Sequence, residues 1–130
     1  DLMVFLRKVV NAALFVLFMG LFGCSGGEPA VSFSGEVKQV LDNNCVSCHV
    51  AGQPGYEASG LALDSYDGLM KGTRFGKVVL PGDAQGSVLN MLVEGRADPS
   101  IAMPHGANRR LYAEEIQVLR RWVEQGASNN

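Results

Sequence analysis

Five consecutive residues, Cys45-Val46-Ser47-Cys48-His49, constrain this 130-residue chain more than any other part of its sequence. They form the pattern C-x-x-C-H, which is typical of covalent haem attachment. On a short helical turn the two thiols can reach the two vinyl groups of one porphyrin, while the next imidazole reaches the iron. We therefore predict one covalent haem c, bound through Cys45 and Cys48, with His49 as the proximal iron ligand.

Three other interpretations of the motif are weaker. A thioredoxin-like dithiol needs a βαβ context, and no such pattern surrounds residues 30–65. A zinc site needs more ligands, and the only other histidine of the chain is His105. A disulfide between Cys45 and Cys48 would close a very small, strained loop.

The sixth iron ligand must come from further along the chain, where a thioether or a second imidazole could supply it. Met70 and Met91 lie in segments with a helical pattern, in which packing is their simpler role. Met103 lies in an extended loop before Pro104, and a proline keeps the preceding residue out of the helical conformation. We predict Met103 as the distal ligand and His105 as the alternative. For the second nitrogen of the proximal imidazole, we expect a backbone carbonyl acceptor between residues 54 and 64.

The N-terminal segment has the layout of a secretory signal. Arg7 and Lys8 precede a run of about fourteen mainly apolar residues, which is shorter than the roughly 20 residues that span a bilayer. Leu21-Phe22-Gly23-Cys24 resembles the lipobox of bacterial lipoproteins, although Phe22 is bulkier than the usual residue. An ordinary signal peptide or an uncleaved anchor is the alternative interpretation.

From this layout we predict three parts of the chain. Residues 1–23 form a signal peptide of the lipoprotein type, and residues 24–33 form a flexible tether whose Cys24 carries the lipid anchor. Residues 34–127 form a cytochrome c domain. The protein is then expected to be exported and held on the periplasmic side of a bacterial membrane.

The domain pattern is helical with long loops. Ser34 is a plausible N-cap for a helix that ends at the motif, Ser87 is another N-cap, and residues 113–125 place apolar residues on one stripe. Val78-Val79-Leu80 is β-like but too isolated to build a sheet. After the leader only six aromatic residues remain, so a buried porphyrin would complete a small core. We predict a small all-α cytochrome c-like fold, with three to five helices and long loops wrapped around one haem.

Beyond the motif, residues 37–127 resemble the planctomycete-type cytochrome c domain, a class I-like family. The segments that carry this resemblance are Gly60–Gly72, Val79–Asp83 with Ser87–Leu89, Met103-Pro104, Glu114–Ile116 and Leu119–Ala127. The resemblance implies a small all-α cytochrome c fold, and it matches Met103 to the Met-Pro-Pro loop of the family. His105 replaces the second proline of that loop, and Tyr112 stands where the family usually has a serine before the last helix.

These patterns lead us to expect a one-electron carrier rather than an enzyme, in a free-standing lipoprotein form that exchanges electrons with redox partner proteins. A haem-based sensor or gas-binding module, or a docking domain of a larger redox complex, is the alternative. The net charge of -2 and the lack of a basic patch argue against nucleic-acid binding.

Overall fold

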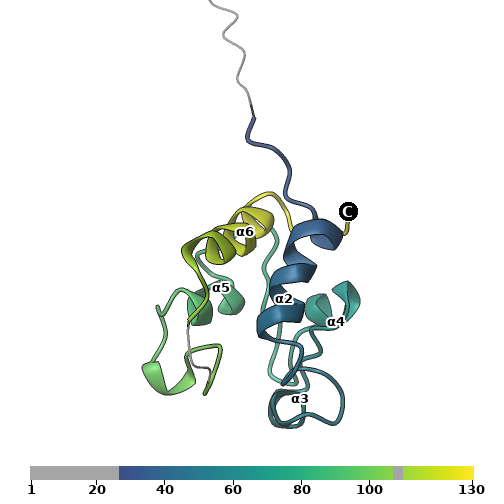
Figure 1. Cartoon of the computed structure of the whole chain (residues 1–130), viewed down its shortest axis with the longest axis vertical. Helices are drawn as coiled ribbons and strands as arrows, with labels where there is room; N and C mark the ends of the chain where they lie inside the picture. Colours follow the sequence, from purple (N-terminus) through teal and green to yellow (C-terminus); the bar gives the residue numbers. More distant parts are fainter. Residues whose placement is uncertain (1–26, 107–109) are drawn as a thin grey trace, which may run out of the picture.

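A computed structural model describes residues 27–106 and 110–130 of the chain (Figure 1). These residues form five α-helices, one π-helical turn and one 3-10 turn, and they contain no strand, which confirms the all-α prediction. The elements are η1 (Phe33–Val37), α2 (Lys38–Asn44), α3 (Pro54–Ser59), α4 (Tyr66–Lys71), α5 (Val88–Val93), η2 (Pro99–Ile101) and α6 (Ala113–Glu124).

The first helix begins at a different residue from the one predicted. The hydroxyl of Ser32 accepts the backbone N–H of Gly35 at 3.0 Å, so Ser32 caps η1, which continues directly into α2. The prediction that Ser34 is the N-cap is wrong. Ser34 instead donates both its N–H and its hydroxyl to the carbonyl oxygen of Asn130, each at 2.9 Å, so its side chain is bound to the far end of the chain.

The packed part of the chain also begins earlier than the boundary predicted at residue 34. Val31 and Phe33 are both buried in the hydrophobic core. Glu28 forms an ion pair with Arg121 of α6 at 2.8 Å. Residues 31–33 therefore belong to the folded domain rather than to a tether.

The predicted signal peptide, residues 1–23, and the predicted lipidation site, Cys24, lie outside the described residues. Within residues 27–106 and 110–130, no helix has both the length and the apolar character needed to cross a bilayer.

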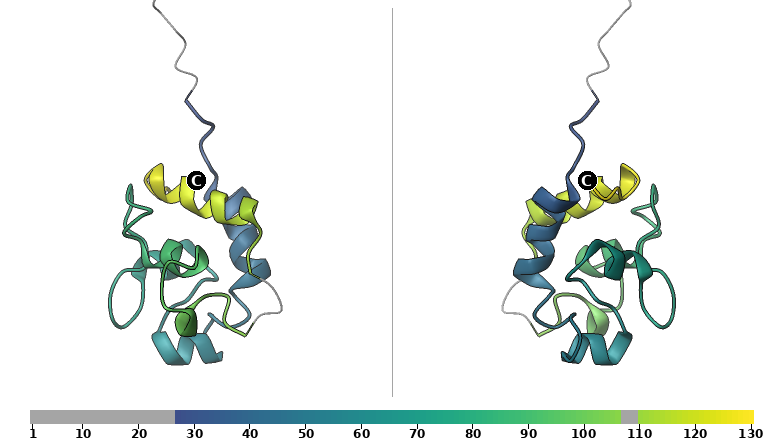
Figure 2. Two further views of the ribbon diagram at one scale, coloured as in Figure 1. Left: turned by 90° about the vertical axis from the view of Figure 1, so that its left-hand side faces the viewer. Right: turned by 90° about the vertical axis from the view of Figure 1, so that its right-hand side faces the viewer.

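An aromatic cluster joins the two ends of the domain. The ring centroid of Phe33 lies 5.1 Å from that of Tyr66 and 5.6 Å from that of Trp122. The Tyr66 hydroxyl donates to the carbonyl of Ala127, and the indole N–H of Trp122 donates to the carbonyl of Ser128, both at 2.9 Å. As a result, η1 packs on α6, and the start and end of the described chain lie at the same end of the molecule (Figure 2).

The last helix closely matches its predicted range. Leu119, Trp122 and Val123 form its buried stripe, and it packs against both η1 and α5. At its start the backbone N–H of Tyr112 donates to Oε2 of Glu115 at 2.7 Å, so a carboxylate supports the position where the family usually has a serine.

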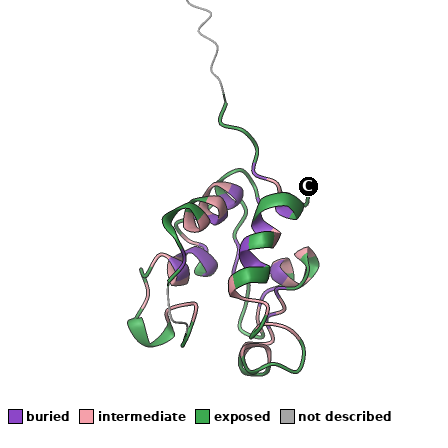
Figure 3. Cartoon of the chain, in the orientation of Figure 1, coloured by how far each residue is buried: buried purple, intermediate pink, exposed green. Residues whose placement is uncertain are grey.

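Burial is uneven along the chain. The fully buried residues lie where η1, α2, α4, α5 and α6 meet (Figure 3). No residue from 42 to 60 and none from 94 to 106 is buried. These two stretches contain the C-x-x-C-H motif and Met103, so the core is incomplete next to the predicted iron ligands.

Candidate functional site

The C-x-x-C-H motif forms one turn at the end of α2. Cys45 caps the helix, and its N–H donates to the carbonyl of Leu41 at 2.8 Å. The N–H groups of Cys48 and His49 then both donate to the carbonyl of Cys45, at 3.1 and 3.0 Å. This is the short helical turn that the spacing predicts. Both thiols are free; Cys48 is exposed and Cys45 is half-buried.

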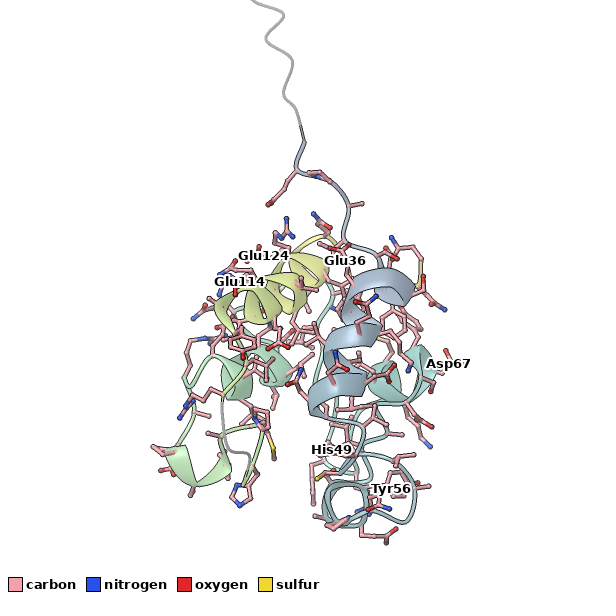
Figure 4. The ribbon with its side chains drawn as sticks, viewed as in Figure 1. Glu36, His49, Tyr56, Asp67, Glu114 and Glu124 are labelled. Atoms are coloured by element: carbon pink, nitrogen blue, oxygen red, sulfur yellow. The ribbon has the colours of Figure 1, made fainter. Side chains whose placement is uncertain are left out.

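His49 is held against α3. The N–H of Tyr56 donates to the carbonyl of Cys48 at 3.1 Å, and the N–H of Leu63 donates to the carbonyl of His49 at 2.8 Å. Figure 4 shows His49 just beyond the end of α2, with Tyr56 on the neighbouring α3. A Cβ on Gly55 would lie only 2.9 Å from both Cε1 and Nε2 of the imidazole, so this close approach requires glycine.

The second nitrogen of this imidazole lacks a partner. Nδ1 of His49 is buried and makes no hydrogen bond of normal geometry among the described residues. Burial lowers the pKa of the imidazole, whereas the backbone of Leu61 raises it. A carbonyl that accepts the ring N–H has this effect on the pKa. Leu61 lies within the stretch, residues 54–64, where we expected the acceptor. The low pKa favours the neutral imidazole, which is the form that binds metal ions.

Cys45 lies in a less polar environment than its partner thiol. Burial raises its pKa to about 11, and the nearby Glu115 and Cys48 add to this effect. Its thiol therefore stays neutral at physiological pH, while the thiol of Cys48 is exposed to solvent.

Met103 and His105 lie in the loop that follows η2. Asp98 caps η2 by accepting the N–H of Ser100 at 2.8 Å. The N–H of Met103 donates to the carbonyl of Leu92 on α5 at 3.5 Å, which attaches the loop to that helix. In Figure 1 this loop lies on the α5 side, whereas the motif lies on the side of α2 and α3. Met103 is half-buried, and His105 is exposed.

The other two candidate methionines have the packing environment that we expected. Met70, on α4, packs against the hydrophobic core, and Met91 is half-buried on α5. Both methionines lie inside helices, and each of these helices also contains buried residues.

Residues 45–105 match the protein family described as planctomycete cytochrome C. This stretch is a planctomycete-type cytochrome c domain. The match begins at Cys45 and ends at His105, so it spans the whole interval between the motif and the Met103 loop. No curated protein and no solved structure matches the chain.

The residues of this cytochrome c domain fit a covalent haem c. Two free thiols and an imidazole share one turn, and the imidazole has a buried Nδ1 that a metal-bound tautomer would protonate. Residues 42–60, which contain the motif, and residues 94–106, which contain Met103, include no buried residue. This is expected for segments that lie beside a large apolar group. Within the described part of the chain, no cluster of three or more His, Cys, Asp or Glu side chains could hold a metal ion, so those residues give the zinc interpretation no support.

Our interpretation of the sequence missed Gly55. The sequence contains a signal for it, because Pro54-Gly55 opens a helix six residues after the second cysteine of the motif. Proline is favoured in the first turn of a helix, but a glycine beside it weakens the helix unless close packing requires it. That combination points to a contact in which a side chain would not fit.

Proposed function

We propose that this protein is a c-type cytochrome that carries single electrons between partner proteins. The observation that supports the proposal most strongly is the turn at the end of α2, where two free thiols and a half-buried imidazole adjoin an incomplete core. The family match supports the cytochrome assignment independently of this geometry.

In the proposed site, the thiols of Cys45 and Cys48 form the two thioether bonds and His49 supplies the proximal nitrogen. Bound haem supplies a one-electron Fe(III)/Fe(II) couple. The backbone of Leu61, which raises the pKa of His49, is the proposed acceptor for the Nδ1–H of the ring, and such a bond would fix the ring tautomer. Helix α3 restrains the ring through its close approach at Gly55.

Met103 is the proposed distal ligand. The bond between its N–H and the carbonyl of Leu92 fixes the loop on α5, opposite the motif, and its neighbour His105 is more exposed. A thioether ligand favours Fe(II) relative to a second imidazole and raises the reduction potential. If His49 and Met103 both bind the iron, no open position would remain for a substrate, so we propose a carrier rather than an enzyme.

Export and anchoring complete the proposal. A signal peptide at residues 1–23 and a lipid on Cys24 would place the domain on the periplasmic side of a membrane, where covalent haem can form and where soluble or membrane redox proteins can reach it.

The attachment of haem is tested by mutating the thiols. In a host with a haem-maturation system, the double variant Cys45→Ala with Cys48→Ala should lose all haem that resists heat and acid, measured by haem staining of denatured protein. Cys24→Ser is the matched control and should keep its covalent haem. Covalent haem in the double variant would refute the attachment sites.

The distal ligand is tested by spectroscopy and potentiometry. Met103→Ala should abolish the methionine-to-iron charge-transfer band of the oxidised protein and lower the reduction potential, while His105→Ala should leave both unchanged. The opposite result would identify His105 as the ligand. A change in the spectrum of reduced wild-type protein on adding carbon monoxide would favour the gas-binding alternative instead.

A further inference from the structure

The most exposed large apolar side chain of the described residues is Phe75, which retains 85% of its accessible surface. It lies in a segment of seven residues, Lys71–Lys77, that we name the basic turn. This segment contains three of the nine Lys and Arg residues found between residues 27 and 130, and it contains no carboxylate. This exposed aromatic ring therefore lies among cations, on a domain whose overall charge is negative.

The basic turn is held rigidly, so the exposure of Phe75 is built into the fold. The N–H of Thr73 donates to the carbonyl of Gly76 at 2.9 Å, and the N–H of Phe75 donates to the hydroxyl of Thr73 at 3.0 Å. Gly72 has a φ of +83°, and a Cβ there would lie 2.5 Å from the carbonyl oxygen of Gly76, so the turn closes only with glycine.

No carboxylate of the described residues forms an ion pair with the cations of the basic turn. Arg74 donates to the carbonyl of Glu57 at 2.7 Å, and Lys77 donates to the carbonyl of Met70 at 2.6 Å; both acceptors are neutral backbone groups. Lys71 is exposed at the end of α4.

Four other cations of the described residues behave differently. Lys38, Arg96, Arg120 and Arg121 all form ion pairs with carboxylates. Among the ion pairs of the described residues, none involves Lys71, Arg74 or Lys77. Positive charge is therefore available for a partner at the basic turn and is largely balanced at these other sites.

The basic turn is connected to the candidate site through α3. The N–H of Arg74 donates to the carbonyl of Ser59 at 2.9 Å, and its side chain packs over Gly60 at the end of the same helix. The start of α3 in turn contacts Cys48 and His49. In Figure 1, α3 lies at the end of the domain opposite the entry of the chain at residue 27.

We propose that the basic turn docks an acidic surface of a partner protein that exchanges electrons with this domain, and this inference rests on the proposed function. Complementary charge steers the encounter, and Phe75 supplies an apolar contact at its centre. The position next to α3 favours a protein over a membrane, because a lipid on Cys24 would hold the opposite end of the domain at the bilayer. It also places the partner beside the haem motif.

The test uses the haem-loaded full chain in detergent and, as a defined acidic surface, a gold electrode coated with a mixed carboxylate- and methyl-terminated monolayer. At low ionic strength, Lys71→Glu with Lys77→Glu should lower adsorption and the electron-transfer rate about tenfold. Phe75→Ala should lower adsorption about threefold, and its effect should persist in high salt.

Lys38→Glu with Arg121→Glu is the matched control, because it changes the net charge equally at paired cations. It should change adsorption less than twofold, that is by under about 0.4 kcal/mol. If this control loses as much adsorption as the basic-turn variant, net charge alone explains binding and the inference is wrong.

Two further measurements separate the possible failures. Dithionite should reduce the wild type and all variants equally in solution. If it fails to reduce the wild type, the proposed function is wrong; if reduction is normal but the basic-turn variants adsorb like wild type, only the docking inference is wrong.

When the protein is bound to phosphatidylglycerol vesicles, Lys71 and Lys77 should remain open to acetylation. Protection of these two lysines would overturn the inference in favour of a membrane contact.

Discussion

Gly55 is the residue that most directly sets the position of the proximal imidazole. Its missing side chain lets α3 approach the ring, since a Cβ would also lie 2.8 Å from the carbonyl oxygen of Cys48. The contact therefore restrains both the last cysteine of the motif and the histidine. A glycine inside a helix usually costs stability, so its presence here reflects packing rather than helix propensity.

Replacing Gly55 with alanine should destabilise the haem-loaded protein by about 1–3 kcal/mol, because the added methyl forces α3 away from His49. The direction of this change in stability is informative, because alanine has a higher helix propensity than glycine and would by itself stabilise α3. Urea unfolding followed at the haem absorption measures the effect. Gly27→Ala, where an added Cβ meets nothing within 4 Å, should be nearly neutral, and a neutral Gly55→Ala would contradict the contact.

Helix α5 connects the core to the proposed distal loop, and Ser87 fixes its start. Ser87 is fully buried. Its hydroxyl accepts the N–H of Leu80 at 2.8 Å and donates to the carbonyl of Asp83 at 2.7 Å, so it organises the preceding turn instead of capping the helix with its side chain. The position of Ser87 at the start of α5 was predictable from sequence, but this use of the hydroxyl was not.

Ser87→Ala should lower the free energy of unfolding by about 1–3 kcal/mol, because it leaves backbone groups of Leu80 and Asp83 without their partner in a buried site. Chemical denaturation of the haem-loaded protein measures this loss. Ser100→Ala serves as the comparison, since Ser100 is exposed and, among the described residues, its hydroxyl bonds only to Asp98. An equal loss in both variants would argue against the special role of Ser87.

The local elements were predictable because their signals are contiguous in sequence. The C-x-x-C-H turn, the helix that starts after Ser87 and the final helix each depend on residues within about one or two turns of one another. The start of the first helix was not, because Ser34 binds Asn130, which lies 96 residues further along the chain. A local cap rule has no access to such a distant acceptor.

At the scale of the whole molecule, the sequence predicts the class of the fold but not its arrangement. Only the structure shows that Phe33 and Trp122 pack together, or that the motif and the Met103 loop both lie where the core is incomplete. These facts depend on how helices pair across the chain. The motif suggested a buried porphyrin, and the uneven burial is what such a group would require of the surrounding protein.

The haem-free chain should lose stability as the pH rises from about 9 to about 11. The ordinary pKa of a cysteine thiol is 9.0, and burial raises the pKa of the Cys45 thiol to about 11 in the folded domain. A group with a raised folded pKa contributes stability below its unfolded pKa, and that contribution is lost as the pH rises through the folded value. The loss is on the order of 2 kcal/mol.

Urea unfolding of the haem-free chain, compared with haem-free Cys45→Ala at each pH, isolates this contribution from the titration of lysines and tyrosines. The difference between the two should shrink as the solution becomes alkaline. The haem-loaded protein should lack the effect, because a thioether has no proton to lose. A constant difference across the range would contradict the half-buried position of Cys45.

The contact between η1 and the last residues has a practical consequence for anything joined to this domain. Ser32 and Ser34 both donate to the carbonyl oxygen of Asn130, so the two ends of the described chain emerge side by side. A fusion partner, an affinity tag or a surface linker attached at either end would therefore occupy the same pole. The opposite pole, with α3, would point outward in both orientations of the fusion and stay open to solution.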